Sequence, residues 1–183
     1  MKLVIIIPLY NDWKSVFLLI KKIQEELEKE MYSYEVLIVN DGSSEMPDDN
    51  FSLDTLRKQI SIKVLSLTCN LGHQRSISIG IAHVHNNYEF SHIVVLDGDG
   101  EDKPHGINLL IESCQNSKST KIIFAEREKR TESKGFLLFY KFIFKILTGE
   151  KVMGGNFCII PKGAIDHLLA LPEIWNLFTF HNR

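Results

Sequence analysis

Residues 92–102 read His-Ile-Val-Val-Leu-Asp-Gly-Asp-Gly-Glu-Asp, and this stretch decides the fold class. Its first half is a short apolar run rich in β-branched residues, which is typical of a strand buried on both faces. Its second half places four carboxylates in six residues, directly after the strand. In open α/β sheets, ligands bind outside the carboxyl ends of the strands. The stretch therefore indicates such a sheet, with a site where this strand ends.

Strand-like and helix-like segments alternate on both sides of this stretch. Further strands are expected at residues 3–7, 35–40, 62–67, 122–125 and 156–160. Helices are expected from Trp13 to about Met31, over 74–85, from near Pro104, over 135–147 and over 162–169. Pro8 should end the first strand, Asn11 or Asp12 can cap the helix that follows it, and 43–54 is the longest expected loop. The pattern predicts an α/β fold with a parallel or mixed sheet flanked by helices on both faces.

The composition limits the class of protein. The chain has 183 residues, which fits one domain, and 44% are apolar, which is enough for a packed core. The formal net charge of -2 argues against a protein that binds nucleic acid by neutralising phosphates. The three cysteines are far apart and form no CxxC pair, which indicates a reducing compartment such as the cytoplasm. No stretch approaches the roughly 18 apolar residues of a membrane-spanning helix.

Polar clusters follow four of the expected strands, at residues 8–11, 41–44, 70–74 and 97–102. The carboxyl ends of parallel strands meet at one edge of a sheet, so these clusters are expected to lie together. The carboxylates of 97–102 repel one another unless a cation compensates, and oxygen ligands of this kind suit Mg²⁺ or Mn²⁺ together with phosphate oxygens. A solvated acidic turn is the alternative. An EF-hand is excluded because Asp102 and Asn108 stand where its glycine and final glutamate belong.

Three other polar motifs leave two interpretations open. Asp41 follows a strand and is either a turn residue or an acceptor for a nucleobase N–H. His73 and Gln74 either cap the next helix or contact a ligand. Arg127 and Arg130 either belong to a solvated charge run or hold a phosphate.

The segment 135–147 is almost wholly apolar, and Lys141 and Lys145 extend a lysine stripe that begins at Lys134. Such a helix either lies in a membrane interface or packs in the core with one exposed edge. Asn156 follows two glycines and marks either a plain bend or a wall of the site.

Taken together and in order, these pieces resemble the inverting family 2 glycosyltransferases, which have the Rossmann-like GT-A nucleotide-sugar fold. Asn70-Leu71-Gly72-His73-Gln74 is similar to a motif of the dolichyl- and polyprenyl-phosphate sugar transferase branch. The resemblance covers about residues 1–170. It implies a nucleotide-binding half over about 1–100 and an acceptor-side half over about 101–183, with further chain expected beyond the C-terminus.

The resemblance also implies roles for individual residues. Asp41 would contact the nucleobase, Asp97 the ribose or sugar, and Asp99 the metal ion, Mg²⁺ or Mn²⁺. Asp102 is the nearest spare carboxylate for a catalytic role beside Asp99. The remaining donor-binding residues would be Pro8, Tyr10, Asn11, Gly72, His73, Gln74, Arg127, Arg130 and Asn156.

One departure concerns the acceptor. Where many members of that branch carry Gly-Asp-Phe-Arg, this chain has Gly155-Asn156-Phe157-Cys158. An asparagine cannot act as a base, which a sugar hydroxyl would need and an anionic phosphate acceptor would not. The missing arginine weakens the expectation of a lipid-phosphate acceptor.

The sequence therefore predicts a metal-dependent transferase that moves a sugar from a nucleoside-diphosphate sugar to a lipid-phosphate or glycan acceptor. Its expected setting is envelope or surface polysaccharide synthesis at the inner face of the cell membrane, with peripheral contact through 135–147. A non-catalytic nucleotide-sugar-binding module is one alternative. A nucleotidyltransferase is another, although residues 8–12 supply no glycine-rich phosphate loop.

Overall fold

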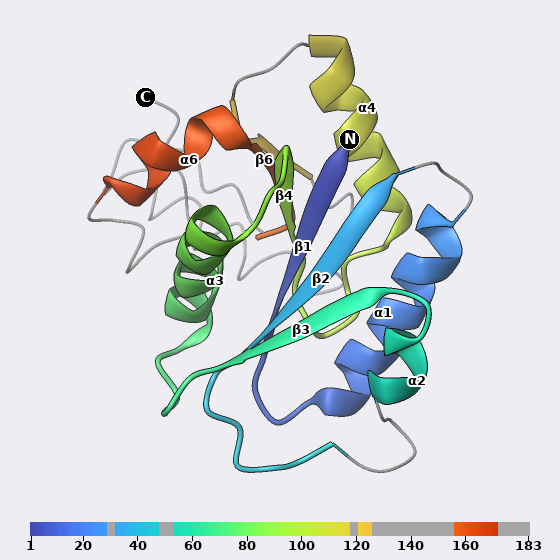
Figure 1. The fold of residues 1–183 in the computed structure, drawn as a ribbon, viewed down its shortest axis with the longest axis vertical. Coiled ribbons are helices and arrows are strands. Elements are labelled where there is room, and N and C mark those ends of the chain that lie inside the picture. The colour runs from blue at the N-terminus through green and yellow to red at the C-terminus, as the bar shows by residue number, and fades with distance from the viewer. Residues whose placement is uncertain (29–31, 48–52, 118–120, 126–155, 172–183) are drawn as a thin grey trace, which may run out of the picture.

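The computed structural model describes residues 1–28, 32–47, 53–117, 121–125 and 156–171 (Figure 1). The segment 135–147, together with Arg127 and Arg130, lies outside the described residues.

One six-stranded sheet organises the described chain. Its strands are β1 (Lys2–Leu9), β2 (Ser33–Asn40), β3 (Ser61–Ser66), β4 (His92–Val95), β5 (Ile123–Phe124) and β6 (Cys158–Pro161). They lie in the order β3-β2-β1-β4-β6-β5. The first four strands are parallel to one another, and β6 is antiparallel to β4 and to β5. The expected mixed, mainly parallel sheet is confirmed.

Helices cover both faces of this sheet, as the sequence predicts (Figure 1). The helices are α1 (Trp13–Leu27), α2 (Leu53–Arg57), α3 (His73–Asn87), α4 (His105–Ser117) and α6 (Lys162–Leu169). Apolar residues of α1, α2 and α4 pack on one face, and those of α3 and α6 pack on the other. Alternate residues of β1 serve the two cores, since Ile5 belongs to the first and Ile6 to the second.

The first strand is longer than the sequence predicts, because it continues through Pro8 to Leu9. The carbonyl of Ile6 accepts the Leu96 N–H at 3.1 Å, so the backbone of Pro8 points toward the same neighbour, β4. The pairing of β1 with β4 ends at Val95. The missing N–H of Pro8 therefore costs no hydrogen bond of the sheet.

Two helix ends also bear on the predictions. Asp12 is the cap of α1, because its Oδ1 accepts the Ser15 N–H at 3.1 Å. The short helix α2 begins at Leu53, so the loop after β2 ends sooner than the expected 43–54.

The strand order locates the site. The chain runs outward from β1 through β2 to β3, and then returns to place β4 on the other side of β1. Between β1 and β4 the order therefore reverses, which leaves a crevice at the carboxyl ends of these two strands. The polar residues that follow β1 and β4 meet at this point.

Candidate active site

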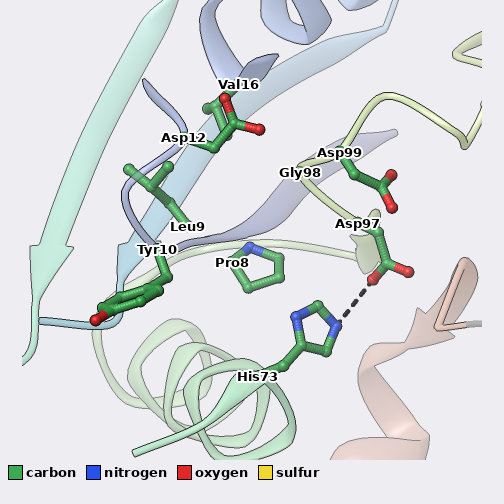
Figure 2. Close-up of a pocket in the computed structure, with 9 residues that line it drawn as sticks. All are labelled: Pro8, Leu9, Tyr10, Asp12, Val16, His73, Asp97, Gly98 and Asp99. Atoms are coloured by element: carbon green, nitrogen blue, oxygen red, sulfur yellow. Dashed lines mark hydrogen bonds and ion pairs between the residues drawn. The ribbon is translucent and has the colours of Figure 1, made fainter. Parts of the chain in front are cut away.

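A pocket opens at the carboxyl ends of β1 and β4 (Figure 2). Its lining consists of Pro8, Leu9, Tyr10, Asp12, Val16, His73, Asp97, Gly98 and Asp99. Tyr10 lies at one end of the pocket and Asp97 and Asp99 lie at the other, with Pro8 between them. Tyr10 is half exposed, so its ring is accessible to a ligand. The same pocket is also lined by the carboxylates of Asp97 and Asp99. Five of the predicted site residues are thus brought together.

Gly98 allows the loop after β4 to approach the end of β1. A Cβ atom at this position would lie 2.7 Å from the carbonyl oxygen of Pro8 and 3.0 Å from Cγ2 of Val16. The first distance is too short for a Cβ atom and involves backbone, and the second would require the Val16 side chain to shift. The glycine between the two aspartates is therefore needed to seat both of them beside Pro8.

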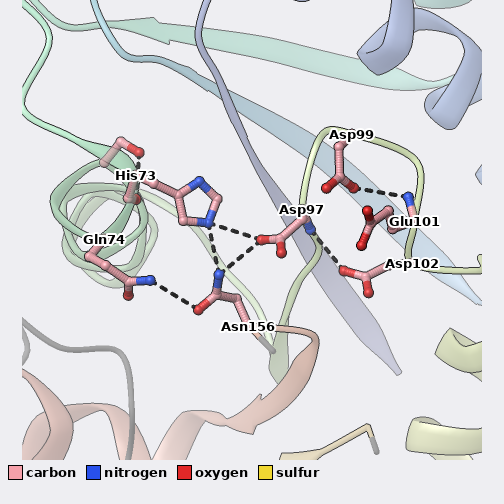
Figure 3. A network of polar contacts seen from close by, with 8 residues as sticks. His73, Gln74, Asp97, Asp99, Glu101, Asp102 and Asn156 are labelled. Carbon is pink, nitrogen blue, oxygen red and sulfur yellow. Dashed lines mark hydrogen bonds and ion pairs between the residues drawn. The ribbon is translucent and has the colours of Figure 1, made fainter. Parts of the chain in front are cut away.

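The Asp97 carboxylate is the centre of a polar network (Figure 3). Its Oδ1 lies 3.0 Å from Nε2 of His73 and accepts a hydrogen bond of 3.0 Å from Nδ2 of Asn156. Gln74 Nε2 donates to Oδ1 of Asn156 at 3.2 Å. His73 and Gln74 therefore face the site rather than capping their helix, whose N-cap is Gly72.

The network changes the acid–base properties of His73. The hydrogen bond with Asp97 raises the pKa of this imidazole above its ordinary value of 6.5, and burial opposes the rise. The negative charges of Asp97, Asp99 and Asp41 add to it. The site therefore favours the imidazolium form of His73 more than water does.

The other acids of 97–102 have different surroundings. Asp99 is on the pocket wall, and its Oδ1 accepts the Glu101 N–H at 2.9 Å across a tight turn. Asp102 is only 2% exposed, and its Oδ2 accepts the Asp97 N–H at 3.0 Å. Asp102 therefore holds the backbone of Asp97 in place. The catalytic role of Asp102 stays a prediction.

Asp41 lies behind the pocket. It is 3% exposed, and its two carboxylate oxygens accept the N–H groups of Leu71 and Gly72 at 2.8 and 2.9 Å. Gly42 adopts a φ of +67°, and a Cβ there would lie 2.4 Å from the backbone of Cys69. Asp41 and Gly42 thus hold the loop that leads to His73, the first through hydrogen bonds and the second through close contact with Cys69. The predicted contact of Asp41 with a nucleobase is not tested by this arrangement and stays a prediction.

Asn11 connects two loops instead of lining the pocket. Its N–H donates to Oγ of Ser43 at 2.9 Å, and its Oδ1 accepts the N–H groups of Ser44 and Glu45 at 2.9 and 3.1 Å. A positive φ of 56° at Asn11 permits this turn. Asn11 therefore supports the pocket through the loop after β2.

Four pocket residues were not singled out from the sequence as site residues. Leu9, Asp12, Val16 and Gly98 all line the pocket. Gly98 carried a signal, because it lies between two predicted site residues. Leu9 and Val16 resemble core residues in the sequence, and only the bend of the chain after β1 shows that they border a ligand space.

Comparisons with known proteins decide the family. Residues 4–167 match the family described as Glycosyl transferase family 2, which is most of the chain. The chain belongs to glycosyl transferase family 2.

Two relatives illustrate the range of family members similar to this chain. The uncharacterized glycosyltransferase YkcC of Bacillus subtilis is 28% identical over 92% of this chain and 52% of its own length. The bactoprenol glucosyl transferase of Shigella phage SfX is 25% identical over 97% of this chain and 58% of its own. The chain therefore spans little more than half the length of these curated relatives.

A solved structure supports the fold. S. aureus TarS 1–349 in complex with UDP-GlcNAc superposes with a TM-score of 0.56 over 91% of this chain and 47% of the TarS 1–349 chain, at 17% identity. The expected GT-A-like α/β fold is confirmed.

The donor atoms at the pocket fit a hard divalent cation. Among the described residues, no group of three or more His, Cys, Asp or Glu side chains is arranged to hold a metal ion by itself. Mg²⁺ and similar ions are commonly bound through one or two carboxylates, with water and substrate phosphates completing the shell. Asp99, with Asp97 beside it on the pocket wall, matches that type of site.

Within the part of the chain that the structure describes, no helix has both the length and the apolar character to cross a bilayer.

Proposed function

We propose that this family 2 chain transfers a sugar from a nucleoside-diphosphate sugar, with inversion, at the pocket between β1 and β4. The observation that carries the proposal is the meeting of Pro8, Tyr10, His73, Asp97 and Asp99 at the point where the strand order reverses. Tyr10 offers a face for a nucleoside, and the two acids mark where the diphosphate and sugar would lie. Residues 1–100 would form most of the donor site.

The roles of the chain's own residues follow from their places. Asp99 would hold the divalent cation, which supplies charge neutralisation for the departing diphosphate when it is bound. Asp97 would hold the ribose or sugar, and the imidazolium of His73 would stabilise negative charge nearby. Arg127 and Arg130 remain proposed phosphate contacts from outside the described residues.

The bond changes follow from the reaction class. An acceptor oxygen attacks the anomeric carbon, the bond from that carbon to the β-phosphate oxygen breaks, and a nucleoside diphosphate leaves with the bonding electrons. A phosphate acceptor is already ionised and needs no base, whereas a hydroxyl acceptor must lose a proton. Asn156 cannot take that proton, and Asp102 is buried against the Asp97 N–H. These facts favour a phosphate acceptor, and the name of the phage SfX relative points to a bactoprenol-type lipid.

A product assay tests this proposal. The purified chain is incubated with Mn²⁺, undecaprenyl phosphate and UDP-glucose, UDP-N-acetylglucosamine or GDP-mannose in turn. We expect a glycolipid to form with release of the nucleoside diphosphate. Release of pyrophosphate in a parallel reaction with a nucleoside triphosphate and glucose 1-phosphate would indicate a nucleotidyltransferase. Tight donor binding without either product would indicate a non-catalytic module.

We also propose that residues 135–147 contact the inner face of the cell membrane. The sequence there combines apolar residues with Lys141 and Lys145. Flotation with vesicles containing anionic lipid should recover the chain, and replacing Phe139 and Phe142 by serine should reduce the recovery. Equal recovery of both forms would contradict this proposal.

A further inference from the structure

Asn156 reaches two elements that are distant from it in sequence (Figure 3). It lies two residues before β6, and its side chain contacts Gln74 in the first turn of α3 and Asp97 in the loop after β4. The two partners are 82 and 59 residues away along the chain. A single amide thus joins the segment before β6 to the first turn of α3 and to the loop after β4.

The bond from Gln74 agrees with the orientation of the Asn156 amide that the Asp97 carboxylate requires. Gln74 Nε2 donates to Oδ1 of Asn156, so the NH₂ group of Asn156 is turned toward the carboxylate. An ionised carboxylate only accepts hydrogen bonds, and the amide NH₂ only donates them. The reverse orientation would set two oxygens against each other at 3.0 Å. The same NH₂ group also lies 2.8 Å from Nε2 of His73.

We propose that Asn156 is a positioning residue, whose amide, oriented by Gln74, holds the Asp97 carboxylate in the place where it meets the donor sugar. The inference rests on the proposed function, because that function gives Asp97 its contact with the donor. An aspartate would set a second negative charge about 3 Å from Asp97, which would repel both that carboxylate and an incoming diphosphate.

The first test needs no nucleotide. The side-chain carboxyl ¹³C shift of Asp97 is measured in the unmodified chain and in the Gln74→Ala, Asn156→Ala and Asn87→Ala variants. We expect Gln74→Ala to move the signal nearly as far as Asn156→Ala, because Gln74 acts through Asn156. Asn87 is exposed, donates to the His83 carbonyl at 2.9 Å and serves as the matched control, which should leave the signal in place. A signal that responds to Asn156→Ala alone would overturn the orienting role of Gln74.

The second test measures binding. The probe is whichever of UDP, GDP, CDP and TDP the unmodified chain binds most tightly with Mn²⁺. Asn156→Ala, Gln74→Ala and the double variant should each lower that affinity by a similar factor of about ten, since all remove the same hydrogen bond to a charged group. Asn156→Asp should lower it further. Additive losses in the double variant, or tighter binding by Asn156→Asp, would overturn the proposal.

The two tests separate this inference from the proposed function. If no nucleotide binds to the unmodified chain, the proposed function fails, and the carboxyl shifts still decide whether Gln74 acts on Asp97 through Asn156. If nucleotide binds and the shifts do not move, the proposed donor site stands and the positioning role fails.

Discussion

Asp41 and Asp97 both follow a buried parallel strand, yet the structure uses them in opposite ways. Asp41 is 3% exposed, and both of its oxygens accept backbone N–H groups of the next loop. The side chain of Asp97 is 16% exposed and lines the pocket, where it meets other side chains. One carboxylate therefore supports the site and the other faces it. Changes near Asp41 should act on stability first, and changes near Asp97 should act on binding first.

The largest effect on stability is expected at Gly42. In the Gly42→Ala variant the new Cβ meets the backbone of Cys69, and the positive φ adds strain. The free energy of unfolding should fall by more than about 3 kcal/mol, measured by urea denaturation. Gly163→Ala is the matched control, because a Cβ there meets nothing within 4 Å in α6, and it should be neutral or slightly stabilising. Equal stability of the two variants would show that the backbone at Cys69 can move away from a Cβ atom at little cost, which would contradict the prediction.

Removing the Asp41 carboxylate should have the next largest effect. Asp41→Ala leaves the Leu71 and Gly72 N–H groups without their acceptors, so the free energy of unfolding should fall by about 2 kcal/mol or more. Asp54→Ala removes an acid whose side chain is 79% exposed, and it should change stability by less than about 0.5 kcal/mol. If Asp41→Ala unfolds at the same urea concentration as the unmodified chain, the anchoring role is wrong.

Asp99 should show the reverse pattern. Asp99→Ala removes an acid on the pocket wall, so stability should change by less than about 0.5 kcal/mol while the Mn²⁺-dependent affinity for nucleotide is lost. Titration calorimetry and thermal unfolding of the same sample compare the two quantities. Glu89→Ala, in an exposed position after α3, should leave both unchanged. Mn²⁺-dependent binding that survives in Asp99→Ala would contradict the metal assignment.

The smallest effect is a change in the titration of His73. Its pKa should lie above 6.5 by NMR, and Asp97→Asn should lower it, because the hydrogen bond with Asp97 is the main cause of the shift. A raised folded-state pKa means that the stability from this pair is full below the unfolded-state pKa. That stability is lost as the pH rises through the folded-state pKa. Asp54→Asn is the control and should not move the titration. The same pKa in Asp97→Asn and in the unmodified chain would contradict the contact.

Much of the fold could be predicted from the sequence, because apolar runs and helical spacing are local patterns. The expected strands all appear, with ends that differ by at most two residues, and Lys162–Leu169 is a helix as expected. The extension of β1 through Pro8 could not be predicted. It depends on where the pairing with β4 stops, and that is a property of the assembled sheet.

The sequence predicts many of the residues that meet at the site. It does not predict which of them line the pocket and which support it from a buried position. Asp41, Asp97 and Asp102 each follow or lie close to a strand end, and nothing local separates the buried from the exposed ones. Burial of Asp41 accompanies its contacts with Leu71 and Gly72, which are 30 and 31 residues away along the chain. The contact of Asn156 with Asp97 joins residues 59 positions apart, so no local pattern contains it.

The most direct test of the central claim is calorimetric titration of the chain with UDP, GDP, CDP and TDP, each with and without Mn²⁺. The pocket at the ends of β1 and β4 predicts tight binding of one nucleotide that requires the metal ion and is lost in Asp99→Ala. Absence of binding by all four nucleotides, in a sample shown to be folded, would contradict the assignment of this pocket as a donor site.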